Sequence, residues 1–150
     1  MKEFLKAFTY AANGIVAAIC STRNLRFHIT VAVYVLLAAP IVLESFFEWA
    51  VVFLTIGFVI AAEIFNSSIE ELCDFITKEK KQQIGLIKDM AAGAVLVSAL
   101  ASVAVGVFLF FLNGRIAKLY DFCLENIWYP VILLVLIIPM ILFIKGKRYD

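Results

Sequence analysis

The sequence predicts an all-α integral membrane protein, and three observations lead to this fold class. Hydrophobic residues make up 64% of the 150 residues and the mean hydropathy is +1.00, whereas soluble domains are about 45–50% apolar. Several uncharged stretches approach the length of about 20 apolar residues that a spanning helix needs. Basic residues gather on one side of these stretches. The length suits one domain, so residues 1–150 are expected to form a single membrane domain.

The N-terminal segment, residues 1–21, is predicted to be an amphipathic helix that lies in the membrane interface. Its apolar residues, among them Phe4, Leu5 and Phe8, recur at helical spacing, while Lys2 and Lys6 fall elsewhere. This pattern is typical of a helix with one face in lipid and the other in water.

Four segments are predicted to cross the membrane. They are 29–43 with its flanking residues, 49–62 if extended from Phe47 through Asn66, 90–114, and 126–144. The fourth contains Pro130 and Pro139, which remove backbone donors, so it is the segment least expected to be one straight rod.

Charge orients these segments and limits the possible partners. All but two of the 13 Lys and Arg lie before the first span, between the second and third, or after the fourth. Arg115 and Lys118 are the exceptions, and the loop ESFFEW, residues 44–49, has no basic residue. The positive-inside rule therefore predicts that both termini and segment 67–88 are cytoplasmic. A net charge of +1 gives no reason to expect nucleic acid as a partner.

Polar residues cluster where the second span would leave the bilayer, in AAEIFNSSIEELCD. On a helix, at about 100° per residue, they share one narrow face. Its members are Glu63, Asn66, Ser67, Glu70 and Asp74. A carboxylate in a membrane segment is a functional hypothesis by default, whereas Glu71, to one side, is expected to face solvent. Mg²⁺ would make such clustering tolerable, since it prefers oxygen ligands and is often bound by one or two carboxylates plus substrate phosphates.

A second polar pair, Lys88 and Asp89, opens the third span. Asp89 is favoured by the helix dipole at an N-terminus, but Lys88 is not, so a bound phosphate would explain it.

A third polar motif, STRNLRFH, precedes the first span and contains Arg23, Asn24, Arg26 and His28. These residues could contact anionic headgroups or a nucleotide. The alternative for the two arginines is simple anchoring at the cytoplasmic face.

The motif EIFNSSIEELCD, followed after a short loop by KDMAAGAVL, resembles the signature of the prokaryotic diacylglycerol kinase family, which includes undecaprenol kinases. The resemblance covers about residues 5–112, and STRNLRFHI looks more like the undecaprenol kinase branch. It implies an ATP- and Mg²⁺-dependent lipid kinase in the bacterial plasma membrane. It also implies a homotrimer whose active sites lie at the cytoplasmic face and are shared between neighbouring subunits.

The resemblance also implies roles for individual residues. Glu63 would be the general base for the lipid hydroxyl, Glu70 would hold Mg²⁺, and Asn66 would support the base or the metal. Lys88 would contact ATP phosphates, and Asp74 and Asp89 would belong to the nucleotide site.

Two features depart from the family pattern. Thr22 stands where members commonly have a Glu, so a second metal ligand would be missing here. The fourth span, 126–144, is also extra, because members usually end after the third.

Three other functions stay open from the sequence. The chain could be a diacylglycerol kinase, or a catalytically impaired member of the family. A small cation transporter with Glu63 as its binding site is a further alternative, but it would not need the Lys88–Asp89 pair.

Overall fold

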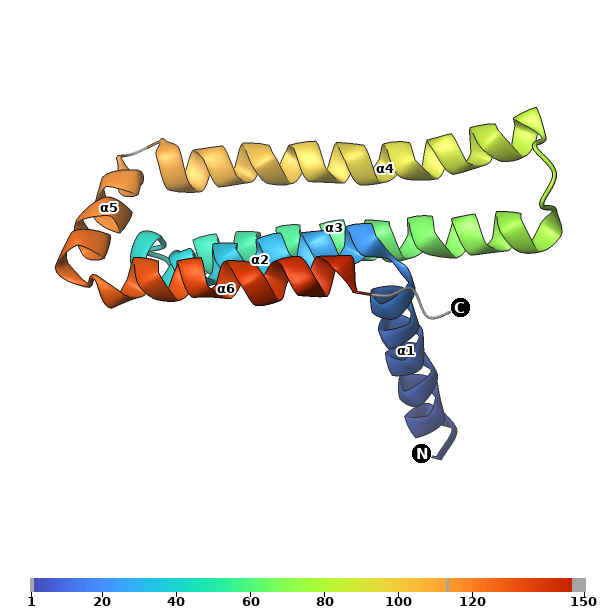
Figure 1. Cartoon of the computed structure of the whole chain (residues 1–150), viewed down its shortest axis with the longest axis horizontal. Coiled ribbons are helices and arrows are strands. Elements are labelled where there is room, and N and C mark those ends of the chain that lie inside the picture. Colours follow the sequence, from blue (N-terminus) through green and yellow to red (C-terminus); the bar gives the residue numbers. More distant parts are fainter. Residues whose placement is uncertain (1, 113, 147–150) are drawn as a thin grey trace.

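The computed structural model describes residues 2–112 and 114–146, and these residues are helical with short connections. Helix α1 (Lys2–Ser21) leads directly into α2 (Arg23–Val42). Figure 1 shows α1 projecting away from the other long helices at a steep angle. The predicted N-terminal helix is thus confirmed as a helix, and its position in the membrane interface stays a prediction.

Helix α3 (Phe46–Ile76) is the longest helix and carries the predicted polar face. It begins with a capping box, in which the Ser45 side chain accepts a hydrogen bond from the Glu48 N–H and the Glu48 side chain accepts one from the Ser45 N–H. Its 31 residues extend about 46 Å, more than the bilayer core of about 30 Å. The end of α3 that holds Asp74 therefore projects beyond the core if Phe46 lies at the opposite edge.

Helix α4 (Gln82–Gly106) runs back beside α3 and continues into one π-helical turn, η1 (Val107–Phe111). The prediction of a third span is confirmed, but the helix begins eight residues before Met90, and η1 ends at Phe111. Residues 67–88, predicted as a cytoplasmic segment, form the end of α3, a turn at 77–81 and the start of α4.

The last two helices return the chain to its starting side. Helix α5 (Arg115–Glu125) is short, and α6 (Trp128–Lys145) lies alongside α2 (Figure 1). Pro130 lies in the first turn of α6, where a missing N–H costs little, while Pro139 is inside the helix. The predicted segment 126–144 is thus a helix, Trp128–Lys145, that is long and apolar enough to span a membrane, whereas α5 was not predicted.

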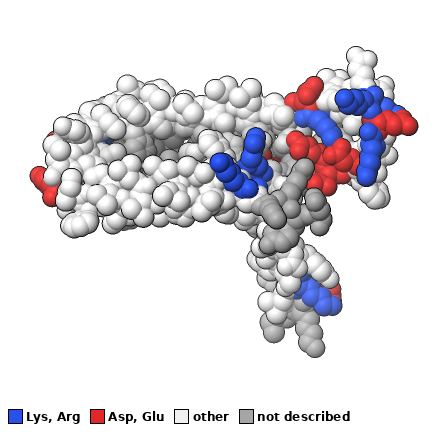
Figure 2. Space-filling view, in the orientation of Figure 1, with Lys and Arg blue, Asp and Glu red and all other residues white. Residues whose placement is uncertain are grey.

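The outer surface of the bundle suits a membrane. Large apolar side chains on α3, α4 and α6 are exposed, including Phe58 and Leu134. Figure 2 shows most charged side chains gathered over the α3–α4 turn, with a broad uncharged surface beside them. By length and composition, five helices could cross a membrane: α1, α2, α3, α4 with η1, and α6. The protein is therefore an all-helical membrane protein.

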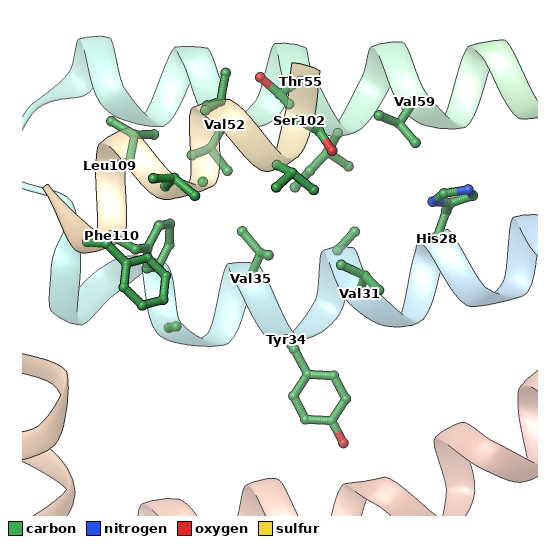
Figure 3. Close-up of a pocket in the computed structure, with 18 of the residues that line it drawn as sticks. His28, Val31, Tyr34, Val35, Val52, Thr55, Val59, Ser102, Leu109 and Phe110 are labelled. Atoms are coloured by element: carbon green, nitrogen blue, oxygen red, sulfur yellow. The ribbon is translucent and has the colours of Figure 1, made fainter. Parts of the chain in front are cut away.

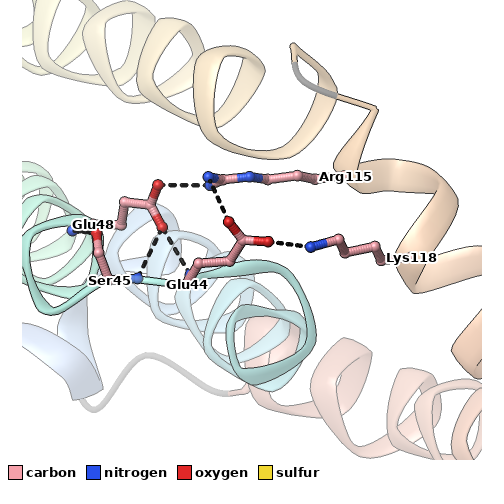
Figure 4. Close-up of polar contacts among 5 residues, drawn as sticks. All are labelled: Glu44, Ser45, Glu48, Arg115 and Lys118. Carbon is pink, nitrogen blue, oxygen red and sulfur yellow. Dashed lines mark hydrogen bonds and ion pairs between the residues drawn. The ribbon is translucent and has the colours of Figure 1, made fainter.

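The ends of the bundle differ in their contacts. At the end away from the α3–α4 turn, Ala39, Val42, Leu43 and Val52 form a buried apolar cluster. Beside it, the Arg115 guanidinium pairs with Glu48 at 2.7 Å and Glu44 at 3.4 Å, and Lys118 also pairs with Glu44 (Figure 4). The two basic residues that the sequence places on the far side are thus both paired with glutamates of the preceding loop and helix.

Candidate active site

The predicted polar face of α3 contains buried, partly unpaired polar groups. Glu63 is only 1% exposed and Asn66 is 5% exposed. Within the described residues, the Glu63 Oε1 and Asn66 Oδ1 atoms have no hydrogen-bond partner. Burying such groups without partners costs free energy, so their retention indicates a functional role.

Glu70 joins this face one turn further on. The Asn66 amide Nδ2 donates a hydrogen bond of 3.0 Å to Glu70 Oε1. Glu70 follows Glu63 by seven residues, which is about two helical turns along the same side of α3. The helix therefore brings together the three residues Glu63, Asn66 and Glu70, as the helical spacing predicted.

The start of α2 lies against the same face. The Thr22 hydroxyl donates to Ser67 Oγ at 3.0 Å, and Ser67 Oγ donates to the Glu63 carbonyl at 2.8 Å. Asn24 lies two residues after Thr22, in the first turn of α2. The position that would carry the missing glutamate is thus beside the acidic face, and Asn24 is its polar neighbour from STRNLRFH.

Lys88 and Asp74 meet near the α3–α4 turn. The Lys88 Nζ atom lies 2.5 Å from Asp74 Oδ1, so α3 and α4 are joined by an ion pair beyond the buried part of the face. Asp89 is exposed and does not take part in this ion pair. The Lys88–Asp74 pair gives a second reason, besides a bound phosphate, for a lysine in the first turns of α4.

An apolar cavity of about 490 Å³ lies between α2, α3 and the end of α4 with η1. Val31 and Val35 of α2 face Val52 and Val59 of α3 across it (Figure 3). Val59 and Ile60 line the cavity one turn before Glu63, so it begins beside the buried carboxylate. His28 lies at one end, while Tyr34 points away toward α6. A hydrocarbon chain would find an apolar environment in this space.

The oxygens of the α3 face fit Mg²⁺ as part of a ligand set. Asn66 Oδ1 is free, and Glu70 lies beside it. Among residues 2–112 and 114–146, no group of three or more His, Cys, Asp or Glu side chains is placed to hold one metal ion. Mg²⁺ is commonly bound by one or two carboxylates, waters and substrate phosphates, so a smaller protein ligand set is compatible with it.

Comparison with known proteins identifies the kind of protein to which this face belongs. Residues 9–110 match the family described as prokaryotic diacylglycerol kinase. The chain belongs to this family. The resemblance found in the sequence, including its undecaprenol kinase branch, is confirmed, and family membership makes the protein a lipid kinase.

Three relatives show the range of this family. The chain is 36% identical over 110 residues to an undecaprenol kinase of Bacillus subtilis, which covers 73% of the chain and 89% of the relative. It is 36% identical over 105 residues to a diacylglycerol kinase of Synechocystis sp., covering 69% of the chain and 60% of that protein. A diacylglycerol kinase of Helicobacter pylori is 29% identical over 96 residues, which cover 64% of the chain and 75% of that protein. No solved structure matches the chain.

The family match includes most of α1 and all of α2, α3 and α4, but it stops before α5 and α6. All the residues of the polar face, with Lys88 and Asp89, lie inside the matched range. The helical hairpin formed by α5 and α6 is therefore an addition to the part of the lipid kinase that carries the candidate site.

Proposed function

We propose that the protein is an ATP- and Mg²⁺-dependent kinase that phosphorylates the hydroxyl of a membrane lipid alcohol, with undecaprenol as its substrate. The observation that carries this proposal is the buried Glu63 carboxylate, which has an unpaired oxygen and lies one helical turn beyond Val59 and Ile60 of the cavity lining. Such a group is suited to accept a proton from an alcohol whose hydrocarbon chain occupies the cavity.

Glu63 acts as the general base in this proposal. It is the eighteenth residue of α3 and lies about 26 Å along the helix, near the depth of a lipid headgroup. Glu63 takes the hydroxyl proton as the lipid oxygen bonds to the γ-phosphorus of ATP. The bond from that phosphorus to the β,γ-bridging oxygen breaks, and ADP leaves. Phosphoryl transfer needs positioning and charge neutralisation more than covalent help from the protein.

The other end of the face receives the nucleotide. Lys88 would contact ATP phosphates, and Asp74, which pairs with Lys88, would orient its ammonium group. Asp89 is exposed next to Lys88 and would complete the nucleotide site. Glu70 would hold Mg²⁺ and Asn66 would support the metal or the base, with Mg²⁺ neutralising phosphate charge during transfer.

The family and the charge pattern support the remaining parts of the proposal. We place the protein in the bacterial plasma membrane with both termini and the α3–α4 turn in the cytoplasm, where ATP is available. The lysines of residues 78–81 at this turn agree with that orientation. We also propose a homotrimer with active sites shared between neighbouring subunits, which could supply oxygen ligands beyond those of one chain.

The experiment that tests the proposal is turnover of ATP by purified protein with undecaprenol or diacylglycerol, with and without Mg²⁺. We expect Mg²⁺-dependent phosphorylation of undecaprenol, and a loss of at least about tenfold in Glu70→Ala and in Glu63→Gln, the range expected for metal and general-base roles. Glu71→Ala is the matched control, because Glu71 is exposed on the same helix.

Different results would point to the alternatives. Preference for diacylglycerol would make the protein a kinase of the kind named for two of its relatives. Absence of turnover with both lipids would favour the impaired family member. Equal turnover in wild type and Glu70→Ala would reject the metal role of Glu70.

A further inference from the structure

Arg26 is a buried cation that joins the ends of two helices distant in sequence. It is 6% exposed. Its Nη1 donates to the carbonyl oxygens of Ile19 at 2.9 Å and Cys20 at 2.8 Å, in the last turn of α1. Its Nε and Nη2 donate to the carbonyl oxygens of Ile144 at 3.4 Å and Gly146 at 3.0 Å, at the end of α6. One guanidinium thus holds α1 and α6 together.

The chemistry of helix ends explains why an arginine suits this position. The last four carbonyl groups of a helix lack intrahelical partners, and the dipole favours a positive charge there. A guanidinium offers five donors in a planar fork, so it can serve two sets of carbonyls at once, whereas a lysine ammonium is a compact point charge. The contacts of Arg26 therefore depend on both helix ends being in place.

The segment that Arg26 holds is the segment that lies against the candidate active site. Thr22, between Cys20 and Arg26, donates its hydroxyl to Ser67 at 3.0 Å. Ser67 in turn donates its hydroxyl to the Glu63 carbonyl at 2.8 Å, so the junction is joined to the turn of α3 that carries Glu63. Much of α1 is exposed, as Phe8 at 61% illustrates, so this junction is where α1 is fixed to the rest of the chain.

Helix α6 is held along its length and provides a fixed point for Arg26. The Tyr129 hydroxyl donates to the Leu37 carbonyl at 2.8 Å, and the Tyr34 hydroxyl donates to the Leu133 carbonyl at 3.3 Å. At the far end, Arg115 and Lys118 of α5 pair with Glu44, and Arg115 also pairs with Glu48 (Figure 4). These contacts join the α5–α6 hairpin to α2 and the start of α3 at three depths.

We propose that the α5–α6 hairpin is a strap that acts through Arg26 to hold the α1–α2 junction against the Glu63 face. Arg26 is then a positioning residue of the kinase, because its guanidinium is bonded to backbone carbonyls and it acts through Thr22, which it fixes beside Ser67 and Glu63. This inference rests on the proposed function. It assigns a role to the part of the chain that the family match does not include.

Kinetics of full-length Arg26→Gln test the effect on catalysis. We expect kcat with lipid to fall about tenfold while the KM for ATP stays within about twofold, since Lys88 and Asp74 lie away from the junction. Arg26→Lys should retain part of the kcat because it keeps the charge. Lys145→Gln is the matched control: it removes an exposed cation at the same end of α6 and leaves the bonds of Arg26 in place, so it should keep the wild-type kcat.

Thiol labelling tests the mechanical link separately from turnover. Cys20 and an introduced Ile144→Cys, each as the only cysteine, lie on the two helix ends and are half-buried in the wild type. In Arg26→Gln, both should react several-fold faster with a maleimide, with no change in Lys145→Gln. Acceleration at one end alone, or an unchanged kcat despite acceleration at both, would overturn the strap. Absence of turnover in wild type would instead defeat the proposed function, while the labelling would still report on the link.

Discussion

Thr22 occupies the position at which the candidate site lacks a carboxylate that family members commonly have. Its hydroxyl is bonded to Ser67, one turn beyond Glu63, so a longer side chain at this position could reach the acidic face. We predict that Thr22→Glu lowers the Mg²⁺ concentration for half-maximal turnover several-fold, because a second carboxylate would be added beside Glu70. The measurement is a Mg²⁺ titration of lipid phosphorylation.

The control for this change is Thr22→Gln, which has a similar size and no charge. It should leave the Mg²⁺ requirement unchanged or raise it slightly, since the bond to Ser67 is lost. If Thr22→Glu and Thr22→Gln gave the same Mg²⁺ dependence, charge at this position would have no part in metal binding.

The position of a single residue could be predicted from the sequence where its spacing matched the helical period. Glu63, Asn66 and Glu70 share a face because their spacing follows the helical period, and Glu63 and Asn66 are buried on that face. The bonds of Arg26 could not be predicted, because Ile144 is 118 residues away and its carbonyl becomes an acceptor only when α6 has folded back. The Lys88–Asp74 pair likewise depends on the close approach of α3 and α4.

At the scale of elements, the ion pairs of α5 with the α2–α3 loop are the clearest feature. Hydrogen bonding to Lys118 is the main cause that lowers the Glu44 pKa below its ordinary value of 4.5, and the charges of Lys118 and Arg115 add to it. A lowered pKa means that the folded state stabilises the ionised form of the Glu44 side chain more than the unfolded state does. The stabilisation is therefore present above the ordinary pKa and is lost as the pH falls through the lowered pKa.

From the direction of this pKa shift, we predict that the Tm of the purified protein falls as the pH drops below about 4.5. The Tm should fall less steeply in Glu44→Gln. The difference should be small, since exposed ion pairs contribute little and are weakened by salt. Glu125→Gln, an exposed glutamate of the same α5 helix, is the control and should follow the wild type. Parallel curves for Glu44→Gln and wild type would show that the pairing of Glu44 does not stabilise the fold.

A comparison of the predicted and observed helices shows which sequence signals were sufficient to predict a helix. Long apolar runs predicted α2, α3, α4 and α6, because helices that cross a membrane must satisfy their backbone internally. The boundaries were less predictable: α3 and α4 continue beyond the apolar runs into the polar region, where charge does not interrupt a helix. Helix α5 was missed because its 11 residues have no long apolar run and its contacts with Glu44 and Glu48 lie far away in sequence.

At the scale of the whole molecule, charge is separated along the bundle. The lysines of the α3–α4 turn and the ends of α1 and α6 lie toward one side, and α5 lies at the other (Figures 1 and 2). Lys147 and Arg148, which belong to the basic set that predicted the orientation, lie outside the described residues. On the far side, Arg115 and Lys118 are paired with glutamates, which reduces the net positive charge of that end.

We predict that the α3–α4 turn is cytoplasmic and α5 is extracytoplasmic, because most of the Lys and Arg residues lie on the side of that turn and the cytoplasmic side carries the excess of Lys and Arg. Lys80→Cys and Glu125→Cys, each as the only cysteine and each exposed, report on the two ends. A membrane-impermeant maleimide added to intact cells should label Glu125→Cys, and it should label Lys80→Cys only after permeabilisation. The reverse pattern would place Glu70, Asp74 and Lys88 on the side without ATP. It would therefore contradict the proposed kinase mechanism as well as the orientation.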